Sequence, residues 1–181
     1  MIAETSRLKI RELTSEDAVF ILALTNEPAT IENIGDKGLR SVADAQRFIS
    51  SGPWTAQQKP GYGQFAIELK HSGELIGVCG ILYRIKLDLT DIGFALMPQY
   101  WRQGFAFEAA SAVMDYGHNT LGISNIVGLT SKTNVASINL LKKLGMRFET
   151  MISMSDDGVE DVQVYAETSL VSATGQESSA S

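Results

Sequence analysis

The stretch Gly93-Phe-Ala-Leu-Met-Pro-Gln-Tyr-Trp-Arg-Gln-Gly-Phe-Ala-Phe-Glu-Ala109 decides how this chain folds. Its first part reads as a β-strand that ends at Pro98, and a turn containing Gly104 leads into a helix. Such a junction presents free backbone N–H groups at the positive end of a helix dipole, and these bind a pyrophosphate without a basic side chain. The stretch therefore predicts either an anion-binding turn, which Gly104 lets a ligand approach closely, or a plain tight connection between strand and helix.

Upstream of this stretch, the pattern predicts a strand, two helices and an antiparallel hairpin. The strand alternates apolar and polar residues, each helix begins at a capping sequence, and the hairpin has a Gly-containing turn. In chain order these segments are the strand at residues 8–12, the helices capped at residues 14–17 and 41–44, and the strands at about residues 65–69 and 75–83.

Downstream, apolar residues at helical spacing continue the helix after Gly104, and a strand, a helix and a hairpin follow. The face of the first helix consists of Ala106, Ala109, Ala110, Val113, Met114 and Gly117. A short buried strand is predicted at residues 125–130, and the second helix should end at Gly145, after two lysines that suit the negative end of its dipole. Asp157-Gly158 predicts the turn of a last hairpin, between strands at about residues 147–154 and 160–167.

This order of elements predicts a mixed α/β (α+β) fold. The sheet should contain about seven strands, mostly antiparallel, with parallel pairing around the two crossover helices and helices on both faces. With 181 residues and 44% apolar content, the chain should form a single domain over residues 1–170. Residues 171–181, which from Ser172 onward consist mainly of Ser, Ala, Gly, Gln and Glu, should be a disordered tail.

Composition excludes several classes of function. Acidic residues outnumber basic ones by 21 to 15, a net charge of −6, so nucleic-acid binding is disfavoured. No apolar run reaches the length of a membrane span and no signal-peptide pattern is present, so we expect a cytoplasmic protein that does not contact membranes. The lone Cys79 reads as a core thiol, and two histidines leave little material for a metal site, so no metal is expected.

The turn containing Gly104 resembles the acetyl-CoA pyrophosphate loop of the GNAT superfamily of N-acetyltransferases. The later segment Asn134-Val-Ala-Ser-Ile-Asn-Leu-Leu-Lys-Lys-Leu-Gly-Met146 resembles the second conserved element of that superfamily. Both elements occur in the family's order and spacing, and the resemblance covers residues 5–166. Trp101, where most members have Gln or Arg, makes the loop most similar to the Rim-type branch of ribosomal-protein N-terminal acetyltransferases.

The resemblance implies a fold in which the strands at residues 91–97 and 126–130 splay apart and admit the pantetheine arm of acetyl-CoA between them. It implies cofactor contacts from three places in the chain. These are the pantetheine-pairing residues Ala95, Leu96 and Met97, the pyrophosphate loop Arg102, Gln103, Gly104, Phe105 and Ala106, and Asn134.

The implied chemistry is direct attack of an amine on the thioester within a ternary complex, which requires a base for the amine and sometimes an acid for the thiolate. Asp91 is the candidate base, acting through a water, or else it is a solvated residue at the start of its strand. Many family members have a Tyr acid where this sequence has Leu141. Ser137 is then the candidate donor to the sulfur, or else a small helix residue packed against the cofactor.

The sequence leaves the amine acceptor open between a protein N-terminal α-amine, as in Rim-type enzymes, and a small-molecule amine. We expect the acceptor pocket to form from the first two helices, the loop at residues 27–40 and the final hairpin. A non-catalytic acyl-CoA-binding module is the alternative, motivated by Leu141, and an accidental resemblance is a third. The oligomeric state is left open between monomer and homodimer.

Overall fold

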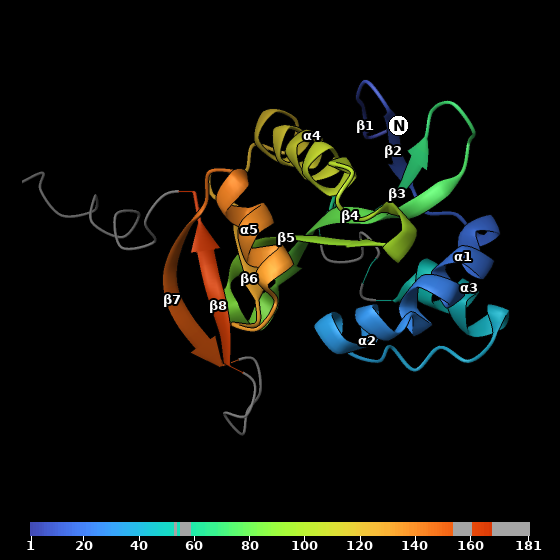
Figure 1. The fold of residues 1–181 in the computed structure, drawn as a ribbon, viewed down its shortest axis with the longest axis horizontal. Helices are drawn as coiled ribbons and strands as arrows, with labels where there is room; N and C mark the ends of the chain where they lie inside the picture. The colour runs from blue at the N-terminus through green and yellow to red at the C-terminus, as the bar shows by residue number, and fades with distance from the viewer. Residues whose placement is uncertain (53, 55–58, 154–160, 168–181) are drawn as a thin grey trace, which may run out of the picture.

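The computed structural model describes residues 1–52, 54, 59–153 and 161–167, which form one eight-stranded sheet with helices on both faces (Figure 1). The helices are α1 (Ala18–Asn26), α2 (Pro28–Ile34), α3 (Val42–Ser51), α4 (Phe105–Asn119) and α5 (Val135–Lys143). The strands are β1 (Ala3–Glu4), β2 (Leu8–Glu12), β3 (Gly63–Leu69), β4 (Leu75–Arg84), β5 (Leu89–Leu96), β6 (Val127–Thr130), β7 (Arg147–Ser153) and β8 (Asp161–Ala166).

The strands lie in the order β1-β2-β3-β4-β5-β6-β8-β7, and every pair is antiparallel except β5 with β6. The predicted mixed, mostly antiparallel sheet is therefore confirmed, with β1 as an additional short strand at one edge. The expectation of parallel pairing around both crossovers is wrong for the second one. The last strand, β8, lies between β6 and β7, so the strands joined through α5 are not neighbours.

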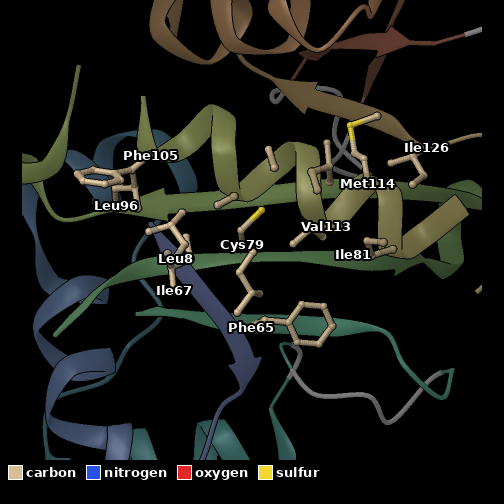
Figure 2. Close-up of a cluster of buried hydrophobic side chains, with 14 of the residues drawn as sticks. Leu8, Phe65, Ile67, Cys79, Ile81, Leu96, Phe105, Val113, Met114 and Ile126 are labelled. Atoms are coloured by element: carbon tan, nitrogen blue, oxygen red, sulfur yellow. The ribbon is translucent and has the colours of Figure 1, made fainter. Parts of the chain in front are cut away.

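The predicted apolar face of α4 packs on one side of the sheet and forms the larger core, shown in Figure 2. Ala109, Ala110 and Val113 are fully buried there. The helix lies so close to the strands that a Cβ on Gly117 would come within 2.6 Å of Ile81 Cδ1. Small residues on α4 therefore set a short distance between helix and sheet, and this fixes where the N-terminus of the helix lies.

Cys79 lies in the same core and is fully buried, as the sequence predicted (Figure 2). Burial raises the pKa of its thiol well above the usual range, which keeps it a protonated apolar group.

The helices α1 and α3 pack on the opposite face of the sheet, as Figure 1 shows. Ile21, Leu24 and Ala45 are fully buried against that face, where they meet Val78 of β4. The predicted cap of α3 is confirmed, because Ser41 Oγ accepts a hydrogen bond from the backbone N–H of Asp44 at 3.1 Å. The second helix, α2, occupies residues that the sequence analysis assigned to a loop.

The helix α5 ends as predicted at Gly145, whose φ of 89° is in the left-handed region. Its N–H donates to Lys142 O, and the N–H of Met146 donates to Leu141 O, the pair of bonds that defines a Schellman motif. The predicted Asp157-Gly158 turn and the tail at residues 171–181 lie outside the described residues. Within the described part of the chain, no helix is long and apolar enough to cross a membrane.

Candidate functional site

The strands β5 and β6 are joined at one point only. Asp91 pairs with Val127, yet β5 continues for five residues past that pair and β6 for three, with no further pairing between them. The predicted splayed parallel pair is therefore present. The gap opens toward the carboxyl ends of both strands, and the loops that lead into α4 and α5 start at those ends.

Backbone groups of β5 that point into this gap can be identified from a hydrogen bond to the neighbouring strand. The N–H of Met97 donates to Ile76 O at 2.9 Å and so points toward β4. Backbone groups alternate in direction along a strand, so those of Ala95 also face β4, whereas those of Phe94 and Leu96 face the gap. Of the three residues predicted to pair with pantetheine, Leu96 alone thus directs its backbone into the gap, and Phe94 joins it.

Sequence reasoning missed Phe94 because alternation fixes the spacing of gap-facing residues but not which alternate set faces the gap. The hydrogen bond between Met97 and Ile76 decides which set faces the gap, and no local sequence pattern indicates that bond.

The carbonyl of Leu96 already accepts a hydrogen bond from Trp101 Nε1 at 2.8 Å. Trp101 itself is 45% exposed, so its indole ties the turn to the end of β5 and does not fill the core.

The turn before α4 is built to expose backbone N–H groups. Arg102 has φ of 58° and Gly104 has φ of 83°, both in the left-handed region. The first intrahelical bond runs from the N–H of Glu108 to Gly104 O. No described residue accepts a hydrogen bond from any backbone N–H of residues 102–107. The turn predicted to bind pyrophosphate therefore presents a run of free donors at the positive end of the α4 dipole.

A brace from the N-terminal segment holds this turn in place. The Arg7 guanidinium pairs with Glu108 Oε2 through Nε at 2.7 Å, donates from Nη1 to Gln103 O at 3.0 Å, and lies 4.2 Å from the centroid of the Phe105 ring. Glu108 Oε1 also accepts from the backbone N–H of Arg7 and from Thr5 Oγ1. Burial would raise the pKa of Glu108, but the bonds from Thr5 and Arg7 hold it below its ordinary value.

The brace explains the structural role that Glu108 plays. The sequence motif gave no sign of Arg7, because the residue lies about a hundred positions upstream of the turn and its type alone is common on surfaces. Phe105 is buried in the core beneath the brace, and Ala106 is half-buried at the first turn of α4.

Asp91 lies where the gap begins, and its surroundings differ from those of a solvated strand residue. It is 3% exposed, and Arg84 of β4 binds both carboxylate oxygens, at 2.7 Å through Nε and 3.1 Å through Nη2. Burial raises the pKa of Asp91, and the Arg84 guanidinium opposes that rise. The alternative of a solvated residue at the start of the strand is therefore wrong.

The residues Asn134 and Ser137 lie at the N-terminus of α5, beyond the open end of the gap on the β6 side. Asn134 caps the helix, because its Oδ1 accepts from the backbone N–H of Ser137 at 3.1 Å. Both side chains are half-buried, and no hydrogen bond involves the Ser137 hydroxyl among the described residues.

Leu141 occupies the position of the Tyr acid found in many family members, and its side chain is part of the core. It is 1% exposed and lies directly over Gly128 of β6, where an added Cβ would fall 2.3 Å from Leu141 Cδ2. Leu141 therefore supplies no proton donor at the position where many family members have the Tyr acid.

Comparison with known proteins agrees with this geometry. Residues 7–147 match the family model described as an acetyltransferase (GNAT) domain. The chain is 33% identical to the uncharacterized N-acetyltransferase YoaA of Bacillus subtilis, over 91% of this chain and 95% of that protein. The chain belongs to the GNAT acetyltransferase family, and it is an acyltransferase by class.

Solved structures support the fold. RimL, a ribosomal-protein α-N-acetyltransferase in complex with coenzyme A, superposes with a TM-score of 0.77 at 16% identity, covering 93% of this chain and 97% of its own. A spermidine N-acetyltransferase from Vibrio cholerae, solved with CoA and spermine, gives a TM-score of 0.73 at 17% identity, covering 90% and 95%. At these identities the two structures establish the fold alone, and they act on different amines.

Proposed function

We propose that this protein transfers the acetyl group of acetyl-CoA to a primary amine, by direct attack within a ternary complex. The observation that carries the proposal is the combination of the free N–H groups at residues 102–107 with the unpaired edge of β5. The unpaired edge belongs to β5, and the turn with the free N–H groups comes directly after β5. Together they fit a ligand in which an anionic pyrophosphate is joined to an extended, peptide-like arm.

The pyrophosphate would bind to the backbone of Arg102, Gln103, Gly104, Phe105 and Ala106. Anions at a helix N-terminus gain from the dipole and from several N–H donors at once. The exposed Arg102 adds positive charge beside the turn, and so does Lys143, whose Nζ lies 4.4 Å from the centroid of the Phe107 ring.

The pantetheine arm would lie in the gap and pair with the gap-facing backbone groups of Phe94 and Leu96, as an added strand does at a sheet edge. Ala95 and Met97 border the arm through their positions on β5, although their backbone groups face β4. The free amide nitrogen of Asn134 remains available to the cofactor, because only its Oδ1 is engaged in the helix cap.

In the reaction, the amine nitrogen bonds to the thioester carbonyl carbon, the C–S bond breaks, and the thiolate leaves as the amine loses a proton. Gap-facing N–H groups of β5 would stabilise the oxyanion that forms. Asp91 would accept the amine proton through a water, since each carboxylate oxygen keeps a lone pair after binding Arg84. Ser137 would donate to the sulfur, and because a thiol has a pKa of about 8.5, the reaction does not depend on a stronger acid.

The acceptor is a primary amine, either a peptide N-terminus or a small molecule. The likeness of the loop to the Rim-type branch supports a peptide N-terminus, and so does the superposition with RimL. The likeness to a spermidine N-acetyltransferase supports a small amine.

A thiol-release assay distinguishes these acceptors. The panel contains peptides that begin with Ser, Ala or Met, polyamines and aminoglycosides, each with saturating acetyl-CoA. Release that depends on one class of amine names the acceptor. Calorimetric binding of acetyl-CoA without release from any amine would favour the alternative, an acyl-CoA-binding module without catalysis.

A further inference from the structure

We propose that Gln64 binds the acceptor amine, with its side-chain carbonyl accepting an N–H of the attacking nitrogen. The inference rests on the proposed acetyl transfer and extends it, because it identifies the face of the sheet from which the amine enters. That face is the one covered by α1 and α3, opposite to α4.

Three residues form a row across the sheet toward the open edge. Gln64 on β3 pairs with Gly80 on β4, and Gly80 pairs with Gly93 on β5. Residues directly opposite one another share a face, and Gln64 alternates with the core residues Phe65 and Ile67, so the row lies on the face away from α4. Two glycines thus leave this part of the sheet without side chains.

The side chain of Gln64 fills the space that the glycines leave. A Cβ on Gly93 would lie 2.5 Å from Gln64 Nε2, so the amide rests directly on the backbone of β5. A Cβ on Gly80 would lie 2.6 Å from Gln64 Cα and 1.9 Å from Gly63 O, so no side chain fits there either. The amide therefore reaches from β3 across β4 to the strand whose far edge is unpaired.

The carbonyl oxygen of this amide has no partner. Gln64 is 7% exposed, and its Oε1 is fully buried, with no hydrogen-bond donor within reach among the described residues. A buried polar atom without a partner destabilises the folded state. An apolar side chain of the same length would avoid that cost, and so would a ligand that donates a hydrogen bond to Oε1.

The place of the amide suits an attacking amine. Gly93 lies two residues beyond Asp91, where the gap opens, and directly before Phe94, which directs its backbone into the gap. The thioester held along β5 would present its carbonyl carbon beside this row. An amine approaching over Gly93 meets the side-chain amide at Nε2, and a rotation of that amide would turn Oε1 toward the amine. Oε1 would then accept one N–H, leaving the lone pair of the amine for the carbon and a second proton for the path to Asp91.

The test compares Gln64→Met, which keeps the length of the side chain without its amide, with the wild type and with Gln46→Met. Gln46 is exposed on α3 and supplies the same chemical change away from the gap. For each protein, calorimetry gives the Kd of acetyl-CoA, and thiol release gives kcat/KM for glycinamide, a small primary amine that mimics a peptide N-terminus.

We expect Gln64→Met to bind acetyl-CoA within about two-fold of wild type while kcat/KM for glycinamide falls roughly 10- to 100-fold, the effect of one hydrogen bond to a nitrogen that becomes charged. Gln46→Met should match wild type in both. A Gln64→Met variant with unchanged kcat/KM overturns the proposal. An equal weakening of acetyl-CoA binding also overturns it, because the residue would then serve the cofactor.

A binding measurement keeps the inference testable without turnover. In a nitrogen-15 spectrum, the Gln64 side-chain amide is the signal that disappears in Gln64→Met. Titration of glycinamide into the CoA-saturated wild type should shift that signal and leave the Gln46 amide unchanged. If the Gln64 signal stays still while thiol release proceeds, the proposal is wrong. If the wild type binds no acetyl-CoA at all, the proposed function itself has failed.

Discussion

Replacing Gly104 with Val tests the pyrophosphate turn, because the residue has both a special backbone conformation and an open approach to the free N–H groups. Its φ is 83°, and the left-handed region costs a residue with a side chain about 1–2 kcal/mol. For a domain of this size, that strain lowers Tm by roughly 2–8 °C. The added Cβ also falls 3.3 Å from Arg7 Nη2, a contact that the half-exposed guanidinium can relieve by a small shift.

The Gly104→Val substitution should weaken acetyl-CoA binding more than it lowers folding stability. The Val side chain covers the donors of the turn, and a hydrogen bond to a charged group contributes about 1.5–3 kcal/mol. Loss of one such bond weakens the Kd for acetyl-CoA roughly 10- to 150-fold. Calorimetric titration of the folded variant measures this change.

Gly122→Val is the matched control for the strain. Gly122 has φ of 68°, nothing lies within 4 Å of its added Cβ, and it belongs to the connection between α4 and β6, away from the turn. It should lose a similar amount of stability and keep the wild-type Kd. A folded Gly104→Val protein that binds acetyl-CoA as tightly as Gly122→Val would refute the assignment of the turn.

Three further results are expected. Asp91→Asn should lower kcat by roughly 10²-fold or more and leave the Kd of acetyl-CoA unchanged, since loss of a general base costs about that much. If kcat, compared with wild type across a pH-rate profile, falls by less than about five-fold, Asp91 has a structural role and is not the base. Gly128→Ala should lower the free energy of unfolding in urea by about 1–3 kcal/mol, because its methyl group would meet Leu141 Cδ2; unchanged stability would contradict the close contact. Burial lowers the pKa of His118, but the bonds to Ile123 O and to Glu167 outweigh burial, so the pKa in the folded protein is raised. The stability that protonated His118 contributes is therefore fully present below the pKa of the unfolded state, and it is lost as pH rises through the pKa of the folded state. His118→Gln should therefore lower Tm more at pH about 5.5 than at pH about 8.5, on either side of the ordinary histidine pKa, and an equal loss at both would exclude the linkage.

Much of the fold follows from local pattern. The face of α4, the cap at Ser41 and the glycine end of α5 are each set by residues close together in the chain, so their signals survive in the sequence. The position of β8 between β6 and β7 is different. Register and strand order in the last hairpin depend on contacts between distant strands, and the alternation within each strand is the same for either order.

The site divides in the same way. The turn around Gly104 is local and was predicted residue by residue, whereas the brace through Arg7 joins residues about a hundred positions apart. The sequence singles out Asp91 as the candidate base, a role that stays a prediction, but its burial and its bonds to Arg84 depend on the pairing of β4 with β5. No sequence pattern indicated Gln64, because its proposed role depends on Gly80 of β4 and Gly93 of β5, which leave room for its side chain.

The central claim is the transfer of an acetyl group to an amine, and product analysis tests it most directly. The wild-type protein is incubated with acetyl-CoA and the acceptor panel, and mass spectrometry follows the amine while the thiol is counted. We expect one amine class to gain a single acetyl group, in equal amount to the thiol released. Thiol release with no acetylated amine, or firm acetyl-CoA binding with neither product, would contradict the claim.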